Sequence, residues 1–185
     1  MACGQVDLVR QGTRMKIIFV RHGEPDYREL EECSYTGFGL DLAPLSEKGR
    51  RQAQELCQNP LLQSANLLVT SAVTRALETA SYVTCATGLS LRVEPLLHEW
   101  QVYESGIENF EKARTLFLEN NGKLLPHSPI QYETAEEMKS RFLKCMAKYR
   151  EYQTVVVVAH RILMRQFVPD EKIDFCQVIE CEVEI

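Results

Sequence analysis

The chain has 185 residues, 45% of them hydrophobic and 25% charged, which is the ordinary make-up of one globular domain with a sizeable core. Its 21 basic and 26 acidic residues give a net charge of -5, so a nucleic-acid partner is not expected. The seven cysteines form no C-x-x-C pair and no metal-ligand spacing with the four histidines, which predicts reduced thiols and no metal site.

The N-terminal residues show no hydrophobic periodicity. Residues 1–14 contain no apolar run long enough for a signal peptide, and no later segment has the length needed to span a bilayer. Met15 immediately precedes the first predicted strand and could itself be a natural start. We therefore expect a single domain over residues 15–185, an extension of no assigned function over residues 1–14, and a soluble, cytoplasmic protein without a membrane partner.

The first predicted strand covers residues 16–20, a short apolar run that includes β-branched side chains. It ends abruptly in the polar sequence R-H-G-E at residues 21–24, where a site could lie. Residues 25–44 hold few apolar anchors and are expected to form a long loop, a feature that is often functional in a compact domain. Ser46 is then a candidate N-cap for a helix that runs to about residue 57.

Two further strands and the helix between them follow in the middle of the chain. Residues 66–70 and 90–94 are the predicted strands, and the intervening helix has three apolar side chains on one face. Gly88 is placed to end this helix. A strand followed by a helix and another strand is typical of α/β proteins.

The second half of the chain contains two predicted amphipathic helices. Residues 109–120 have apolar side chains at helical spacing and end before Gly122. Thr134 or a neighbouring residue caps a longer helix, whose apolar stripe is expected to belong to the core. That stripe consists of Met138, Phe142, Cys145 and Tyr149.

The last elements complete the predicted fold. Residues 155–158 form the strongest buried strand of the chain, which ends at His160 before a helical stretch to about residue 167. From residue 175 onward, residues alternate with a period of two and one face is acidic, as in a strand near a sheet edge. The sequence therefore predicts a three-layer α/β/α sandwich with a mostly parallel sheet and helices on both faces.

Polar side chains follow three of the predicted strands, at the point where each strand ends. They belong to residues 21–22, residues 71–75 and His160. In open α/β sheets, ligands bind at the carboxyl ends of the strands, so these segments are expected to converge. Two imidazoles and two guanidiniums suit a phosphate group, because arginine binds phosphate oxygens bidentately and a neutral imidazole can attack phosphorus. This chemistry needs no metal.

Five short motifs occur in order along the chain. They are R-H-G-E at residues 21–24, D-L-A-P-L-S-E-K-G at 41–49, S-A-V-T-R-A-L-E-T-A at 71–80, L-H-E-W at 97–100 and A-H at 159–160. Together they resemble the motifs of the histidine phosphatase (phosphoglycerate mutase-like) superfamily, over nearly the whole chain from Lys16. The second motif has one residue more before Pro44 than the family pattern, and the usual proline after Ser71 is absent.

The resemblance implies roles for five side chains. His22 would be the nucleophile that becomes phosphorylated, and Glu99 would give a proton to the leaving group. Arg21, Arg75 and His160 would hold the phosphoryl oxygens around His22, which makes His160 a third catalytic residue. Water activated by Glu99 would then hydrolyse the phosphohistidine.

Other charged residues leave alternatives open. Glu94 and Glu104 lie near Glu99 in the sequence and could substitute for it as the acid. His98 is expected to be structural or to line the entrance, and His127 to be exposed in a loop.

One position departs from the family pattern, which commonly has glycine after the second histidine. This chain has Arg161, whose bulky side chain could narrow the pocket or add a third cation. Arg165 lies within the predicted helix and could be structural or help to position the loop.

The expected function is that of a metal-independent phosphomonoester hydrolase without a cofactor, acting through phosphohistidine on a small phosphorylated metabolite. One alternative is a phosphoglycerate mutase-like phosphotransferase, although P-D-Y-R at residues 25–28 stands where the mutase branch usually has serine, tryptophan and asparagine. The other is a non-catalytic phospho-ligand-binding protein, which would not need a nucleophile and an acid together. Residues 100–131 are expected to cover the pocket, whereas the substrate and the formation of a homo-oligomer stay open.

Overall fold

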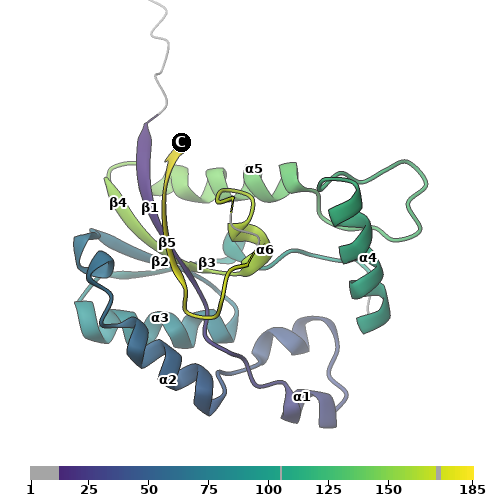
Figure 1. Cartoon of the computed structure of the whole chain (residues 1–185), viewed down its shortest axis with the longest axis horizontal. Coiled ribbons are helices and arrows are strands. Elements are labelled where there is room, and N and C mark those ends of the chain that lie inside the picture. Colours follow the sequence, from purple (N-terminus) through teal and green to yellow (C-terminus); the bar gives the residue numbers. More distant parts are fainter. Residues whose placement is uncertain (1–12, 105, 170–171) are drawn as a thin grey trace, which may run out of the picture.

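A sheet runs through the centre of the computed structural model, which describes residues 13–104, 106–169 and 172–185 (Figure 1). Its strands are β1 (Arg14–Arg21), β2 (Leu67–Ser71), β3 (Leu91–Glu94), β4 (Thr154–Ala159) and β5 (Val178–Glu184). Their order in the described sheet is β3-β2-β4-β1-β5. The pairs from β3 to β1 are parallel, and β5 pairs antiparallel with β1 at one edge, as expected for the last strand.

The side chains of β1 contribute to two separate cores. Ile17 and Phe19 point to one face of the sheet and Ile18 and Val20 to the other, and all four are fully buried. A strand that is buried on both faces is continuously apolar, as in parallel sheets covered by helices. Burial of each of these side chains stabilises the fold by about 1.5–3 kcal/mol.

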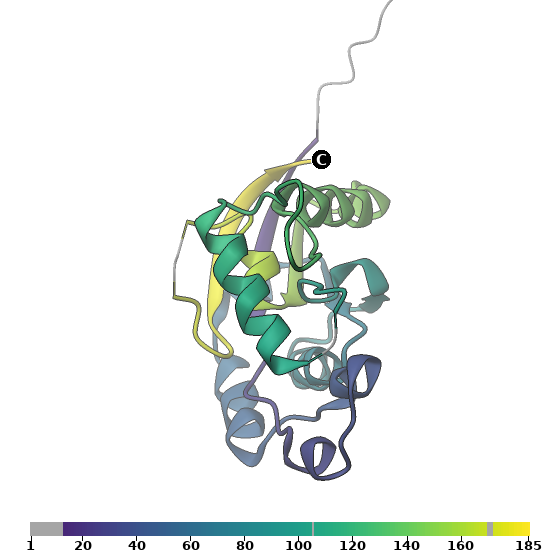
Figure 2. The ribbon, with the colours of Figure 1, turned by 90° about the vertical axis from the view of Figure 1, so that its right-hand side faces the viewer.

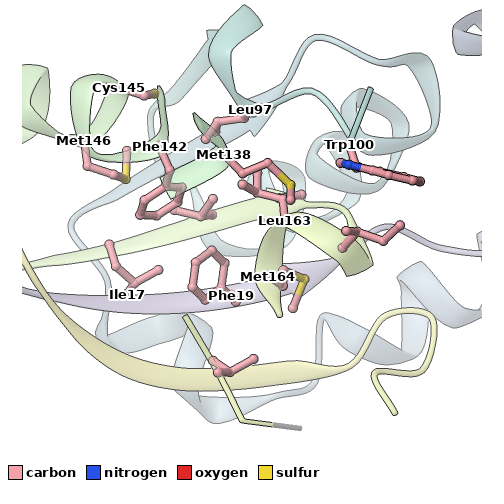
Figure 3. Close-up of a cluster of buried hydrophobic side chains, with 14 of the residues drawn as sticks. Ile17, Phe19, Leu97, Trp100, Met138, Phe142, Cys145, Met146, Leu163 and Met164 are labelled. Atoms are coloured by element: carbon pink, nitrogen blue, oxygen red, sulfur yellow. The ribbon is translucent and has the colours of Figure 1, made fainter. Parts of the chain in front are cut away.

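Helices cover both faces of the sheet, which confirms the predicted three-layer sandwich. Two of them pack on the face of Ile18, and the others contribute to the core around Phe19 (Figure 3). The first two are α2 (Glu47–Leu56) and α3 (Thr74–Thr87), and the others are α4 (Ile107–Glu119), α5 (Ala135–Met146) and α6 (Arg161–Met164). In Figure 2, α4 lies in front of α6, at the outside of the molecule.

Local sequence signals set several helix ends, as predicted. At the start of α2, Ser46 Oγ accepts a hydrogen bond from the Gly49 N–H group at 3.0 Å. Thr134 and Glu137 form a capping box at the start of α5, in which each side chain accepts from the other residue's N–H group. Gly88 follows α3 with φ of 74°, a left-handed conformation that glycine adopts without strain.

The prediction of a loop over residues 25–44 is wrong in part. This segment contains the short helix α1 (Arg28–Glu32) and the 3-10 helix η1 (Gly37–Leu42). Leu30 of α1 is buried, and the Asp26 carboxylate accepts from the N–H group of Arg28 at 3.1 Å. Helices this short expose no apolar periodicity in the sequence, so a single buried anchor and a local hydrogen bond decide their formation.

The last predicted helix is also shorter than expected. It ends as α6 at Met164 rather than near residue 167, and Arg165 is its C-cap rather than an interior residue. Beyond Met164, the ring of Phe167 packs on that of Phe142, with centroids 4.3 Å apart. Pro169, which cannot donate a helical hydrogen bond, follows this turn, so both packing and a proline limit the helix.

None of the helices within the described ranges is long and apolar enough to cross a membrane. The predicted N-terminal extension falls largely on residues 1–12, which lie outside the described residues. Arg14 already belongs to β1, where it is opposite Glu184 of β5. The domain boundary at residue 15 stays a prediction.

Candidate active site

The candidate site lies where three neighbouring parallel strands end. Arg21 ends β1 and His22 follows it, Ser71 ends β2, and His160 follows the last residue of β4. Because β4 lies between β1 and β2, the three ends meet at one edge of the sheet. The rings of His22 and His160 are 5.1 Å apart between centroids. The structure thus brings together the segments that the strand pattern led us to expect in one place.

The hydrogen bond of His22 fixes the tautomer of its ring. Nδ1 lies 2.7 Å from the carbonyl oxygen of Gly23, and a carbonyl can only accept, so Nδ1 carries the proton. The other nitrogen, Nε2, then keeps its lone pair. Burial and the charge of Arg75 lower the pKa of His22 to about 3, so the ring is neutral at pH 7. His22 has the electronic state that a nucleophile requires.

His160 is fully buried beside Ser71. Its Nε2 is 2.9 Å from Ser71 Oγ, which also accepts a hydrogen bond from the N–H group of Val73 at 3.3 Å. When the hydroxyl of Ser71 donates to Nε2, the ring proton of His160 lies on Nδ1. Burial, followed by the neighbouring His22 and Arg75, lowers the pKa of His160 well below its ordinary value.

Two residues near the C-terminus of the chain contact the guanidinium group of Arg21. One of its Nη atoms donates to the carbonyl oxygen of Ile173 at 2.6 Å, and its guanidinium carbon lies 3.8 Å from the centroid of the Phe175 ring. The same ring is 5.7 Å from that of His22 between centroids. Burial and the positive charge of Arg161 lower the pKa of Arg21 to about 10, so the group stays charged at pH 7.

Several buried donors of the site have no hydrogen-bond partner among the described residues. They are Arg21 Nε, Arg75 Nε and Nη1, and His160 Nδ1. Arg75 is 6% exposed, and Asp41 is 3.8 Å from its Nη1 atom, too far for a hydrogen bond. A buried donor left unpaired costs about 1–3 kcal/mol, and more when charged. An anion with several oxygen atoms is the kind of partner that guanidinium and imidazole N–H groups bind.

The Glu99 carboxylate is held by the first turn of α6. It accepts from the N–H groups of Leu163 at 3.3 Å and Ile162 at 3.4 Å, and from its neighbour Trp100 at 2.9 Å. Its charge acts on both Arg21 and Tyr27, so it lies close enough to the strand ends to influence the charged groups there. The carboxylate thus has a fixed direction.

The two alternative carboxylates have other partners. Glu94 is buried and accepts from Lys148 Nζ at 2.7 Å and from the Tyr149 hydroxyl at 2.6 Å. Glu104 accepts from the N–H group of Gln131 in an exposed loop. Of the three, Glu99 is the carboxylate whose charge is felt by Arg21.

The two remaining histidines differ in position. His98 is half-buried, its Nδ1 lies 2.7 Å from the Glu99 carbonyl oxygen, and its charge is among those that lower the pKa of His160. His127 is exposed in a turn with φ of 66°. Both positions agree with the expectation from the sequence.

Two glycines of the motifs serve close packing rather than chemistry. A Cβ atom at Gly23 would lie 2.8 Å from the Gly49 carbonyl oxygen, and one at Gly49 would lie 2.1 Å from that of Glu24. The first two motifs therefore touch through their backbones. Thr79 supports the same loop, because its Oγ1 accepts from the Gly23 N–H group at 3.0 Å. This contact fixes the backbone on which His22 is placed.

Sequence reasoning missed three residues of the site. Phe175 belongs to a segment expected only to lead into the last strand, Tyr27 was counted within a loop, and Asp41 was noted only as part of a motif. Burial raises the pKa of Tyr27, and Arg75, Asp41 and Glu99 act on it as charges, which locates its hydroxyl near the site. Each of these contacts joins segments far apart in the sequence, and no local pattern marks them.

Comparison with known proteins identifies the family. Residues 17–170 match the family model described as "Histidine phosphatase superfamily (branch 1)". The chain belongs to the histidine phosphatase superfamily. The predicted family and enzyme type, a phosphatase of the histidine phosphatase kind, are thereby confirmed. Ile173 and Phe175, which hold Arg21, lie beyond the matched residues.

Individual relatives agree with this assignment. Phosphoserine phosphatase 1 of Hydrogenobacter thermophilus is 28% identical over 164 residues, covering 82% of this chain and 73% of that protein. The solved structure named Mycobacterial hydrolase 1 has a TM-score of 0.62 and 26% identity, and the match covers 83% of this chain and 78% of that one. Phosphoglycerate mutase from Bacillus anthracis str. Sterne has a TM-score of 0.65 at 18% identity, covering 94% and 90% of the two chains, and shows the shared fold.

Proposed function

We propose that the protein is a metal-independent phosphomonoester hydrolase that acts through a phosphohistidine intermediate on a small phosphorylated metabolite. The observation that supports this most is the set of buried, unpartnered nitrogen atoms on Arg21, Arg75 and His160, next to the neutral ring of His22. A phosphoryl group offers three oxygen atoms to such donors. Phosphatases among the relatives at 25% identity or more support the same reading.

The first step forms the phosphoenzyme. Nε2 of His22 attacks phosphorus with its lone pair, and the bond between phosphorus and the ester oxygen breaks. Glu99, in its protonated form, gives a proton to the departing oxygen, which for a poor leaving group accelerates the step by about 100- to 10,000-fold. Arg21, Arg75 and His160 hold the three equatorial oxygens, whose charge they stabilise in the transition state.

The second step returns the free enzyme. Glu99, now a carboxylate, takes a proton from a water molecule as that water attacks phosphorus. The bond between phosphorus and Nε2 breaks, its electron pair returns to the ring of His22, and inorganic phosphate leaves. The hydrogen bond from Nδ1 to the Gly23 carbonyl is retained throughout, so the ring does not turn between the two steps.

The two alternatives differ in what they require of these residues. A phosphotransferase would move phosphate between hydroxyl groups rather than release it, and the mutase named above, at 18% identity, supports the fold but not that activity. A non-catalytic binding protein would need the arginines but not an unprotonated nucleophile and a directed carboxylate together. Hydrolysis uses all five groups.

The remaining parts of the proposal concern the setting of the enzyme. We place it in the cytoplasm, because the cysteines of the described residues are free, including the exposed Cys33 and Cys85. The net charge of -5 disfavours nucleic acid as a partner. We treat residues 15–185 as one domain and the small phosphate ester as its partner.

Release of inorganic phosphate tests the proposal. A panel of phosphomonoesters is incubated with the wild type in excess chelator, next to His22→Ala and the control His127→Asn, which removes an exposed imidazole. We expect turnover in the wild type and the control, and a loss to below about one thousandth in His22→Ala. Turnover that the chelator abolishes, or that His22→Ala retains, would contradict the proposal; circular dichroism confirms that each variant is folded.

A further inference from the structure

A cavity of about 250 Å³ lies beside α6, outside the group of residues that the proposed reaction uses. Residues from the C-terminal half of α4, the start of α5, α6 and the turn after α6 line it. Its polar lining consists of three arginines, Arg114, Arg161 and Arg165, together with Asn121 and Gln166. No aspartate or glutamate is among the described residues that line it.

Few acidic groups of the described residues neutralise the positive charge of the arginines in this cavity. For the guanidinium groups of Arg161 and Arg165, the described residues provide no hydrogen bond or ion pair, and both side chains are half-buried. Arg114 pairs with Glu111 on its own helix at 3.4 Å, through a carboxylate that is 61% exposed and contributes little. Arg161 and Arg165 are also four residues apart on one helical face, where like charges repel. The cavity is therefore a site of concentrated positive charge.

The helix α6 contributes residues both to the cavity and to the surroundings of the proposed phosphate site. Arg161 lines the cavity and directly follows His160, and its charge acts on Arg21. Ile162 lines the cavity as well, and its N–H group donates to the carboxylate of Glu99. Because Glu99 protonates the leaving oxygen, the alcohol part of the substrate leaves on the side where α6 begins. Arg161 stands at this same start of α6 and lines the cavity.

We propose that this cavity binds a second anionic group, a carboxylate or a second phosphate, on the alcohol part of the substrate. The inference depends on the proposed hydrolase function and narrows its substrate class to phosphate esters of anionic alcohols. Arginine suits this role because its planar fork binds either group bidentately. Asn121 and Gln166 add neutral donors to the same cavity.

Matched esters test the inference. Each pair has one alkyl chain with a phosphate at one end and, at the other, either a neutral hydroxyl or a carboxylate or phosphate, in a series of increasing length. We expect the wild type to prefer the doubly anionic member by about tenfold or more in kcat/KM at the length that reaches the cavity. The measured quantity is the ratio of kcat/KM within a pair, because a general loss of activity cancels from it.

Three variants assign the preference to the cavity. Arg165→Gln should reduce the ratio by about tenfold, Arg165→Lys should restore part of it, and Arg150→Gln, which removes a charge from an exposed position away from the cavity, should leave it unchanged. A ratio near one in an active wild type, or a ratio that Arg165→Gln does not change, would overturn the inference. A wild type that hydrolyses no ester would instead overturn the proposed function itself.

Discussion

Replacement of Arg75 by methionine separates the stability of the site from its function. The variant removes a buried guanidinium and keeps most of the length of its apolar stem. In the wild type, Nε and Nη1 of Arg75 are buried without hydrogen-bond partners, and Asp41 is 3.8 Å away. Replacing a buried ionic group by a well-packed apolar side chain of similar volume is often stabilising by about 1–4 kcal/mol. We expect the free energy of unfolding to rise by that amount while hydrolysis is lost.

Thermal unfolding without and with inorganic phosphate measures this effect. For a protein of this size, 1 kcal/mol corresponds to a change in Tm of about 2–4 °C, so Arg75→Met should unfold at least about 2 °C above the wild type. Phosphate should raise the Tm of the wild type, because it binds only the folded state, but not that of the variant. Arg51→Met, at an exposed position of α2, is the control and should change stability by less than about 0.5 kcal/mol. A lower Tm for Arg75→Met in the absence of phosphate would refute the reasoning.

Four further predictions follow from the geometry. Glu99→Gln should slow phosphoenzyme formation by about 100-fold or more for esters with poor leaving groups, and much less for esters with good ones. Equal slowing of phosphoenzyme formation for both kinds of ester would remove Glu99 as the acid. Asp41→Asn should lower the inhibition constant for inorganic phosphate by about two- to fivefold, because the Asp41 carboxylate competes with phosphate for the buried Arg75. A raised inhibition constant would argue against that competition. Phe175→Leu removes the ring under Arg21 and should reduce kcat/KM by about 2- to 30-fold, whereas unchanged kinetics would make the ring dispensable. The pKa of His22 falls from an ordinary 6.5 to about 3 on folding, so the unfolded chain binds a proton that the folded one does not. The contribution of His22 to the free energy of unfolding should therefore be complete above about pH 6.5 and fall by about 1.4 kcal/mol per pH unit toward pH 3. Urea denaturation at a series of pH values should show that the free energy of unfolding depends less on pH in His22→Gln.

The positions of the two histidines could be predicted from the sequence because they depend on topology. Buried strands that end in polar residues are visible as apolar runs, and the carboxyl ends of parallel strands meet regardless of side-chain detail. These two facts were enough to predict that His22 and His160 lie close together. The same reasoning placed Arg75, at the start of the helix after β2, near the site.

Other features could not be predicted, because they arise from contacts between distant segments or from the exact path of the backbone. Phe175 packs under Arg21 because the chain returns beside β1, where β5 pairs with it. The tautomer of His22 is set by a carbonyl one residue away, through a backbone direction that sequence patterns do not show. The turn after Met164 combines a ring contact between Phe167 and α5 with a nearby proline, Pro169, and the ring contact has no local signal. Contacts between distant segments or the exact direction of the backbone decide these features.

The central claim, that phosphate passes through His22, is tested most directly by isolating the phosphoenzyme. Glu99→Gln is mixed with a radioactively labelled phosphate ester that has a good leaving group, because this variant should form phosphohistidine and hydrolyse it slowly. We predict label on the protein that survives alkali, is lost in acid, and maps to the peptide that contains His22; a matched sample with His22→Ala in addition should carry none. Label that is stable in acid, or that persists without His22, would contradict the claim.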